Sequence, residues 1–298
     1  GNGYFLANGA GADLSEEFWH NDDYIAIAHM GGHKGNRVFA AVAFMPSDLE
    51  DELSHLFAEQ TRCEYDEKAE RFIHQDELKL GAITIASQPS KQPLDKSERT
   101  KAWLNLFSKQ GFSLFNEQPD SEQLLIRMSL ASKLLPESFP LLNHDELIAD
   151  NQWLAPYLDD IKNLEQLKKF NYSEAIKSCF DWQQQSLLNE HLPLRLTVPS
   201  GSNVKVTYQL DGPAKLSVRM QEVYGMTSTP LLAQGKLPLL MELLSPARRP
   251  LQLTQDLANF WQTSYRDVQK EMKGRYPKHF WPDDPATSQA TNKVKSKM

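Results

Sequence analysis

The sequence predicts a multi-domain α+β protein with a small β domain, a helical region, and a β-rich C-terminal domain that ends in helices and an extended tail. Strand-like runs between glycine-rich turns fill residues 1–90, apolar residues at helical spacing fill 95–190, and alternating runs return after residue 203. A length of 298 residues allows two or three domains with a sizeable core in each. The predicted segments are 1–92, 93–190, 191–285 and 286–298.

The composition is that of a folded, water-soluble chain. Hydrophobic residues make up 40% and charged residues 24%, and no apolar run approaches the roughly 18 residues of a membrane-spanning helix. The chain starts at Gly1 without Met or a signal peptide, so we expect a fragment cut from a longer protein. Cys63 and Cys179 have no Cys or His neighbour at ligand spacing, which predicts a reduced, cytoplasmic protein without a zinc site.

The net charge of −7 is unevenly distributed along the chain. Residues 200–298 contain 14 Lys and Arg against 8 Asp and Glu, whereas residues 1–199 contain 18 against 31. The acidic excess argues against nucleic acid wrapping the whole chain, and a polyanion would bind at the basic end. Ordinary variation in charge along a chain is an alternative of equal weight.

Residues 1–45 predict strands joined by glycine-rich turns, which indicates a small barrel or sheet. The expected strands are 3–7, 24–28 and 37–44. The spacing of Gly31, Gly32 and Gly35 suggests a phosphate-binding loop as an alternative for the last connection. No Gly-Lys-Ser/Thr follows and both flanks resemble strands, so we predict a plain hairpin.

A helix is expected over residues 46–57, because Ser47 is a good N-cap and acidic residues fill the first turn. Its expected apolar face consists of Leu49, Leu53, Leu56 and Phe57. A metal site is an alternative for the acidic residues, but a solvated helix start is favoured. These acidic residues are Asp48, Glu50, Asp51 and Glu52. The β domain is expected to end with strands at 62–66, 71–74 and 78–86 and a linker at 88–94.

Residues 95–190 predict a helical bundle. The expected helices are 97–107, 122–135, 145–158 and 172–188. Gly111 stands at a typical position just after a helix C-terminus. We predict that Trp103, Trp153 and Trp182 lie in the core rather than bind ligands. Cys179 lies on an apolar helix face with no activating group near it in sequence, so we assign it no catalytic role.

The C-terminal domain starts with two alternating runs, 204–210 and 214–220, which a Gly-Pro turn joins into a pair of strands. The elements expected next are a strand at 239–244, a turn at 245–250, and helices at 255–261 and 265–273. Residues 286–298 are polar and basic, and we expect them to be disordered.

The stretch 270–285 alternates cations with aromatic rings and contains three prolines. Such a composition binds phosphates and stacks on bases. It equally suits a docking segment whose aromatics are buried and whose cations pair with the acidic excess of residues 1–199. Eight residues of this stretch and of the preceding turn are candidates for nucleic-acid binding: Arg248, Arg249, Lys270, Lys273, Arg275, Tyr276, Lys278 and Trp281.

The same residues carry a resemblance to a known family. Residues 243–261 and 270–285, with the Ser264-Tyr265 pair between them, resemble the C-terminal region of the bacterial HrpB-type ATP-dependent helicases. The opening Tyr4-Phe-Leu-Ala-Asn-Gly-Ala-Gly-Ala12 resembles the segment that follows the helical-bundle domain of that family. The resemblance implies a DEAH-type RNA helicase of superfamily 2, whose two RecA-like domains lie upstream and hydrolyse ATP. It also implies that residues 1–92 form an oligonucleotide-binding-like (OB-like) domain.

The chain departs from the whole helicase in one respect. It has no Gly-Lys-Ser/Thr loop and no Asp-Glu-x-His motif. The family's catalytic, cofactor-binding and metal-binding residues therefore correspond to no position here, and ATP and Mg belong to the missing upstream domains. The candidate acid-base histidines are His29, His33, His74 and His279, and they share no catalytic motif with the scattered acids.

Two functions follow as alternatives. In the first, the chain is a non-catalytic accessory region that supports the helicase core and contacts single-stranded RNA or DNA. In the second, it is a protein-protein docking module of the helicase without direct nucleic-acid contact. Both alternatives imply the upstream RecA-like domains as partners and exclude a membrane.

Overall fold

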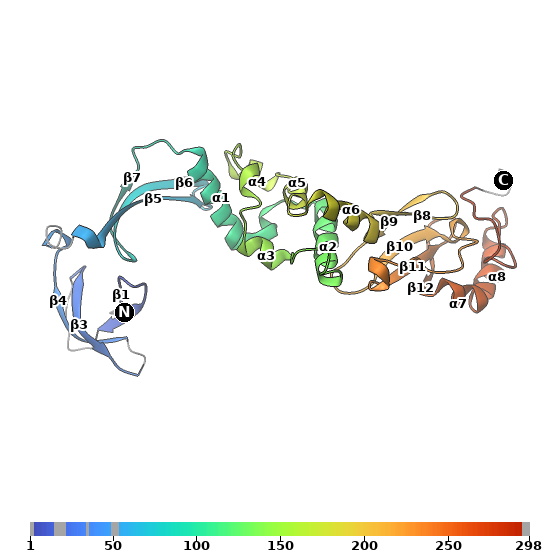
Figure 1. Cartoon of the computed structure of the whole chain (residues 1–298), viewed down its shortest axis with the longest axis horizontal. Helices are drawn as coiled ribbons and strands as arrows, with labels where there is room; N and C mark the ends of the chain where they lie inside the picture. Colours follow the sequence, from blue (N-terminus) through green and yellow to red (C-terminus); the bar gives the residue numbers. More distant parts are fainter. Residues whose placement is uncertain (1–2, 15–21, 34–35, 49–53, 294–298) are drawn as a thin grey trace. The chain divides into compact units, whose positions relative to one another are not determined.

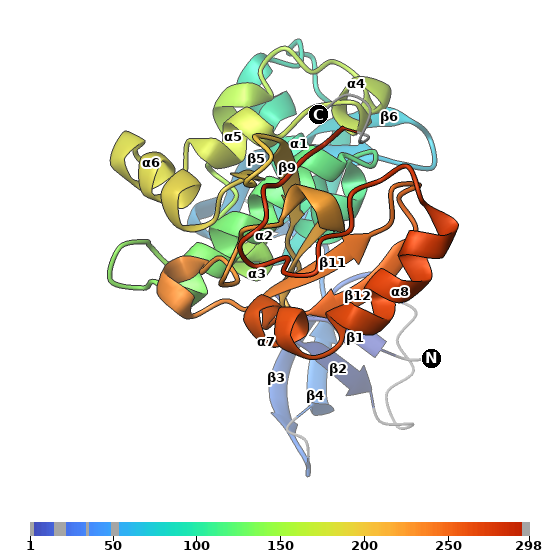
Figure 2. The same cartoon turned by 90° about the vertical axis from the view of Figure 1, so that its right-hand side faces the viewer.

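The computed structural model describes residues 3–14, 22–33, 36–48 and 54–293. The chain forms two compact units, which are described separately: unit 1 comprises residues 1–106 with 158–164, and unit 2 comprises 107–157 with 165–298. Several sheets and helices confirm the predicted α+β class (Figures 1 and 2). The domain boundaries at 92, 190 and 285 and the OB-like assignment stay predictions. Among the described residues, no helix is long and apolar enough to span a membrane.

The first sheet of unit 1 has the strand order β1-β2-β4-β3. Its strands are β1 (Gly3–Phe5), β2 (Gly11–Leu14), β3 (Ile25–Gly31) and β4 (Arg37–Ala43). Strands β3 and β4 are antiparallel, and Gly31 pairs with Arg37 at the end of the ladder. This pairing confirms the hairpin that was predicted in place of a phosphate-binding loop.

The second sheet of unit 1 has the order β5-β6-β7. Its strands are β5 (Phe57–Asp66), β6 (Arg71–Leu80) and β7 (Ile83–Pro89). The single strand predicted over 78–86 is wrong, because the chain reverses at Gly81 and β6 pairs antiparallel with β7. Gly81 has φ of +58°, a conformation that glycine adopts at little cost.

The helix predicted over 46–57 is also wrong in the part that is described. Short 3-10 turns occupy η1 (Pro46–Asp48) and η2 (Ser54–Leu56), and Phe57 already belongs to β5. Residues 49–53, which include most of the acidic cluster, lie outside the described residues. The cause is tertiary, since Phe57 pairs with Leu80 at the end of a long β5–β6 ladder that helix formation would remove.

Helix α1 (Lys96–Gln110) packs its Trp103 against the second sheet. The ring is fully buried, and its centroid lies 4.7 Å from that of Tyr65 and 4.8 Å from that of Phe72. The indole Nε1 donates to the carbonyl oxygen of Ile161 at 3.0 Å. Burial of Trp103 agrees with its predicted core position.

The turn at Gly81 gives a testable stability prediction. A Cβ on Gly81 would lie 2.2 Å from the carbonyl oxygen of Ala7, an atom that also accepts from the Ala82 N–H at 2.7 Å. Replacing Gly81 by Ala should therefore destabilise unit 1 by about 2–4 kcal/mol, from backbone strain and overlap. Amide hydrogen exchange across β6 and β7 measures the change.

Gly11→Ala is the matched control, because a Cβ there meets no atom within 4 Å. We expect protection in β6 and β7 to be unchanged in the control. Equal protection in the two variants would contradict the close approach of the turn to Ala7.

Unit 2 begins with a series of helices, most of them short. They are η3 (Gly111–Leu114), α2 (Pro119–Leu134), α3 (His144–Ala149), η4 (Ala155–Tyr157), α4 (Leu164–Lys168), α5 (Ser173–Lys177) and α6 (Trp182–His191). The helix predicted over 172–188 is in fact two, because Asp181 starts a new helix. Its carboxylate accepts from the Gln184 N–H at 2.8 Å, and Gln184 Oε1 accepts in return from the Asp181 N–H. The helix predicted over 145–158 likewise ends at Ala149.

An aromatic cluster fills the core between these helices. Its rings belong to Phe107, Phe112, Phe115, Trp153 and Tyr172. Trp153 lies at the edge of this cluster and donates through Nε1 to the Leu147 carbonyl. The core position predicted for Trp182 is wrong. It is the first residue of α6, and 83% of its surface is exposed.

The C-terminal sheet of unit 2 has the order β12-β11-β10-β9-β8. Its strands are β8 (Arg195–Thr197), β9 (Asn203–Thr207), β10 (Ala214–Arg219), β11 (Leu239–Leu244) and β12 (Pro250–Thr254). The predicted antiparallel pair β9–β10 is confirmed, and β11 runs parallel to β10. Strands β8 and β12 were not predicted. Between β10 and β11 lie the 3-10 turns η5 (Met220–Glu222) and η6 (Ala233–Gly235).

Two helices and an extended segment complete unit 2. Helices α7 (Leu257–Gln262) and α8 (Tyr265–Arg275) lie beside the β12 edge of the sheet in both views (Figures 1 and 2). The disorder predicted from residue 286 onward needs correction for 286–293. Thr291 is buried and donates its N–H to the Gln221 carbonyl at 2.9 Å, which fixes this part against η5. Residues 294–298 lie outside the described residues.

Candidate nucleic-acid-binding surfaces

The segment after α8 is held closely against its own unit. Trp281 is 4% exposed and donates through Nε1 to the Tyr276 carbonyl at 3.1 Å. The Tyr265 hydroxyl donates to the Pro282 carbonyl at 2.8 Å, and Gln269 donates to the carbonyl of Trp281 at 3.2 Å. Trp281 therefore has no free face for a base, which corrects its candidacy as a stacking residue.

Tyr276 and Phe280 are half-buried. The Tyr276 ring meets His279 edge-on, with 6.1 Å between the ring centroids. The carbonyl of Phe280 accepts from the hydroxyl of Tyr224, and from the side-chain amide of Gln221, at 3.3 Å each. The stretch thus combines one buried ring and two half-buried rings with a bonded backbone, as the docking-segment alternative predicts for its aromatics.

The cations of the stretch remain at the surface. Lys270, Lys273, Arg275 and Lys278 are all exposed. Lys273 pairs with Asp283 at 3.0 Å and Arg275 with Glu271 at 3.3 Å, so these two pairs are local rather than with the acids of residues 1–199. Within the described part of the chain, Lys270 and Lys278 have no ion-pair partner within 4.0 Å.

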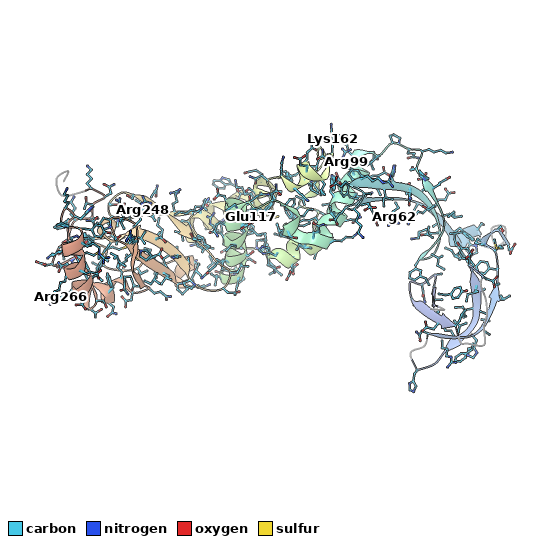
Figure 3. All side chains as sticks on the ribbon, turned by 180° about the vertical axis from the view of Figure 1, so that it is seen from behind. Arg62, Arg99, Glu117, Lys162, Arg248 and Arg266 are labelled. Carbon is cyan, nitrogen blue, oxygen red and sulfur yellow. The ribbon has the colours of Figure 1, made fainter. Side chains whose placement is uncertain are left out.

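One face of α8 gathers three cations. Arg266, Lys270 and Lys273 follow at helical spacing and line the same shallow hollow, together with Gln269 and Asp283. Arg248 and Arg249 are exposed too, but they stand on the turn between β11 and β12. Figure 3 shows Arg248 and Arg266 at separate places on unit 2. The predicted cations therefore form two groups.

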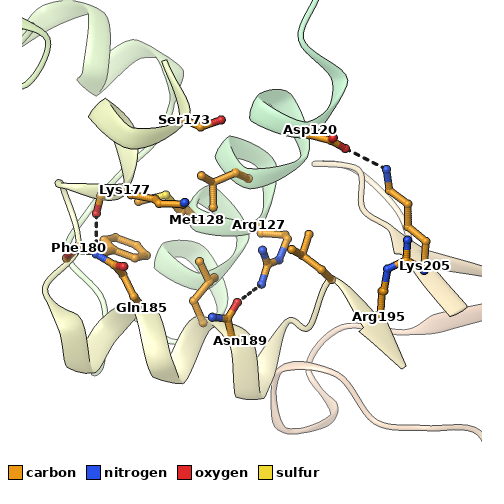
Figure 4. Close-up of a pocket in the computed structure, with 13 residues that line it drawn as sticks. Asp120, Arg127, Met128, Ser173, Lys177, Phe180, Gln185, Asn189, Arg195 and Lys205 are labelled. Atoms are coloured by element: carbon orange, nitrogen blue, oxygen red, sulfur yellow. Dashed lines mark hydrogen bonds and ion pairs between the residues drawn. The ribbon is translucent and has the colours of Figure 1, made fainter. Parts of the chain in front are cut away.

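A second basic site was not predicted. It is a pocket of about 500 Å³ between α2, α5, α6 and the strands β8 and β9 (Figure 4). We call it the Arg127 pocket. Its lining contains one acidic side chain, Asp120, and four basic ones: Arg127, Lys177, Arg195 and Lys205.

Arg127 is the buried member of this group, with 1% of its surface exposed. Its Nε donates to the Leu192 carbonyl at 2.6 Å and one terminal nitrogen donates to Asn189 Oδ1 at 2.8 Å. No carboxylate among the described residues lies within ion-pair distance. Burial lowers the pKa of Arg127, but an arginine keeps its proton in proteins, so the pocket holds a buried positive charge without a counter-ion.

The other three cations are less buried and have partners of their own. Lys177 pairs with Glu174 at 2.6 Å and Lys205 with Asp120 at 3.2 Å. Arg195 donates to the Asn203 carbonyl at 3.0 Å. The one sequence signal for this site was Arg127 itself, a charge on the apolar face of the predicted helix 122–135.

The described residues support neither a metal centre nor a reactive thiol. They contain no group of three or more His, Cys, Asp or Glu side chains that could hold a metal ion. Burial raises the pKa of the thiols of Cys63 and Cys179, that of Cys63 to about 11. A raised pKa keeps both thiols protonated and weakly nucleophilic at neutral pH.

Comparison with known proteins shows which proteins this chain resembles. Residues 153–285 match the family described as ATP-dependent helicase C-terminal. The chain is 38% identical to the ATP-dependent RNA helicase HrpB of Escherichia coli (strain K12), over 98% of this chain and 37% of that protein.

Two solved structures agree with this match. The crystal structure of the E. coli DExH-box NTPase HrpB has a TM-score of 0.82 and 37% identity, over 97% of this chain and 36% of that one. The crystal structure of the Escherichia coli DEAH/RHA helicase HrpB has a TM-score of 0.73 and 34% identity, over 94% and 35%. The chain thus spans about a third of the length of these relatives. Residues 153–285 belong to the family of ATP-dependent helicase C-terminal domains, and the chain as a whole is similar to part of the HrpB helicase.

Proposed function

We propose that this chain is the non-catalytic accessory region of an ATP-dependent RNA helicase, where it supports the helicase core and contacts single-stranded nucleic acid. The family match supports the accessory role. In this proposal the upstream RecA-like domains are its partners, ATP and Mg bind to them, and the whole protein is cytoplasmic. The chain's own contribution is a surface along which the nucleic acid passes.

The basic face of α8 is the observation that carries the nucleic-acid contact. Arg266, Lys270 and Lys273 project from one side of a single helix, and Lys270 has no ion pair among the described residues. Exposed pairs such as Lys273–Asp283 contribute little to stability, so a phosphate can replace the carboxylate at small cost. The buried ring of Trp281 holds the segment that follows this helix, so docking and nucleic-acid binding coexist in one stretch.

A docking module without nucleic-acid contact is the second candidate. The observation in its favour is a set of exposed apolar side chains on unit 1, which includes Phe5, Val42 and Met45. Exposed apolar side chains are typical of surfaces that contact another protein or domain. In this case they would meet the upstream helicase domains.

Removing the α8 cations tests the nucleic-acid contact. We expect the triple variant Arg266→Gln, Lys270→Gln, Lys273→Gln to bind single-stranded RNA more weakly than the unmodified chain. Log affinity falls as log salt rises, and each phosphate that is no longer neutralised makes this slope less steep by about 0.7. Three such phosphates therefore make it less steep by about 2. Fluorescence anisotropy of a labelled oligouridylate, titrated with the full chain over a range of salt concentrations, measures both quantities.

The matched control removes three other exposed cations of unit 2, in the variant Lys109→Gln, Lys168→Gln, Lys169→Gln. It changes the net charge equally but should leave the salt slope within error. If the unmodified chain fails to bind the RNA even at low salt, nucleic-acid contact is refuted and the docking module is the better account.

A further inference from the structure

The Arg127 pocket has the physical properties of an anion site. A buried guanidinium without a carboxylate is costly, because its charge has lost water and gained only neutral acceptors. Those acceptors are the Leu192 carbonyl and the amide oxygen of Asn189, which also fix the orientation of the group. An anion that enters the pocket would supply the missing counter-charge in surroundings of low dielectric constant, where the attraction is strong.

The other basic residues indicate which anion fits. Lys177, Arg195 and Lys205 line the same pocket, and Asp120 is the one acidic side chain there. Several cations around one buried arginine suit a group with several charged oxygens, as in phosphate. The volume of about 500 Å³ exceeds what one phosphate needs and leaves room for a nucleotide.

An exposed aromatic ring lies on the face of α6 that lines the pocket. Gln185 and Asn189 line the pocket, and Trp182 lies on the same helix face, three and seven residues before them. The Trp182 ring is 83% exposed, which is unusual for a tryptophan in a region with its own aromatic core. A flat exposed ring beside a phosphate site is the arrangement that stacks a base.

We propose that the Arg127 pocket binds a backbone phosphate of a single-stranded nucleic acid, and that Trp182 stacks on an adjacent base. Arg127 is the buried anchor, while Arg195 and Lys205 receive the phosphate from solvent. That the phosphate comes from a nucleic acid rests on the proposed function. That the pocket binds a phosphate rests on the pocket alone. It adds a second contact region to the basic face of α8.

The first experiment changes exposed residues, which are expected to leave the fold intact. In the full chain, the double variant Arg195→Gln, Lys205→Gln should weaken binding to labelled oligouridylate and lower the salt slope by about 1 to 1.5. Trp182→Ala should weaken binding roughly tenfold, with no change in slope, because stacking involves no counter-ion release. The control is Lys168→Gln, Lys169→Gln, which carries the same charge change at exposed sites outside the pocket.

The second experiment follows Arg127 directly. Its Nε–H resonance, assigned by its absence in an Arg127→Lys variant, should shift when inorganic phosphate is added and should return when the phosphate is dialysed out. Oligouridylate should shift the same resonance at lower concentration. The titration itself uses only the unmodified chain, and the Arg127→Lys variant serves only to assign the resonance.

The outcomes separate this inference from the proposed function. If the chain binds RNA through α8 while the Arg195→Gln, Lys205→Gln variant and Trp182→Ala keep the control's affinity and slope, the pocket proposal is overturned and the proposed function stands. If phosphate shifts Arg127 but RNA neither binds nor shifts it, the RNA source is overturned and the site belongs to a small phosphorylated molecule. If the Arg195→Gln, Lys205→Gln variant loses affinity and RNA shifts the Arg127 resonance, the proposal holds.

Discussion

Replacing Trp281 by Ala destabilises unit 2 by about 3–5 kcal/mol, the range found for removing a large buried aromatic side chain. The ring is 4% exposed, so its loss leaves a cavity where the C-terminal segment meets the rest of the unit. The Tyr276 carbonyl also loses its indole donor. No other single substitution in the segment 276–285 is expected to cost as much.

Amide hydrogen exchange is the suitable measurement, because a chain of two units has no single unfolding midpoint. Protection across β10, β11 and α8 should fall at least a hundredfold, which follows from about 3 kcal/mol at 1.4 kcal/mol per factor of ten. Trp281→Phe keeps most of the ring and loses the donor, so it should cost roughly 1–2 kcal/mol.

Trp182→Ala is the matched control for this substitution, since it is the same change at an exposed ring. We expect it to alter exchange protection by less than about 0.5 kcal/mol. A Trp281→Ala variant as stable as this control would show that the ring is not part of the core, and would return it to the candidates for base stacking.

Replacing Trp103 by Ala has a comparable effect on unit 1, about 3–5 kcal/mol. The ring lies between α1 and the aromatic side chains of β5 and β6, where it contacts Tyr65 and Phe72. Its removal also leaves the Ile161 carbonyl without its donor. The segment 158–164 joins unit 1 in part through that bond, so its protection should fall together with that of α1.

Exchange in β5, β6 and α1 measures this loss, and exchange in β10 and β11 serves as an internal reference. Protection of unit 1 should fall while that of unit 2 stays unchanged, because the two units have separate cores. An equal loss in both units would contradict that separation. Trp103→Phe, which retains ring contacts with Tyr65 and Phe72, should recover more than half of the stability.

The Trp281 prediction bears on function through the stretch 270–285. Its rings and its cations have different roles in the structure: Trp281 holds the segment in place, and the cations remain in water. A variant at Trp281 that weakens RNA binding would therefore act through the fold. Weaker binding by the α8 cation variant at unchanged stability would instead identify a direct contact.

Local sequence patterns predicted many of the elements well. The alternation in 204–210 and 214–220 predicted the β9–β10 pair, and the apolar spacing after Ser121 predicted the position of α2. Both patterns reflect which side of one element faces the core, and that information lies within a few neighbouring residues. The family signature at 243–285 was visible for the same reason, as a continuous run of residues.

Elements that depend on distant partners were missed. Strand β12 contains Pro250 and Gln252, a weak strand pattern, and it forms because β11 offers an edge to pair with. Phe57 was assigned to a helix, but its pairing with Leu80 places it in β5. Asp181 divides a predicted long helix through its cap, which competes with the helical spacing of the apolar residues around it.

The sequence by itself determined the α+β class, the resemblance to the HrpB-type helicases, and the absence of the helicase ATP-binding motifs from this chain. Only the tertiary structure decided which aromatic rings are buried and where cations meet. Trp182 and Trp281 are the same residue type, yet one is exposed and the other buried. Burial depends on which segments pack over a residue, and Arg127 lies beside Arg195 and Lys205 only because α2 and the β8–β9 strands fold together. Those contacts join positions far apart in the chain, which no local pattern records.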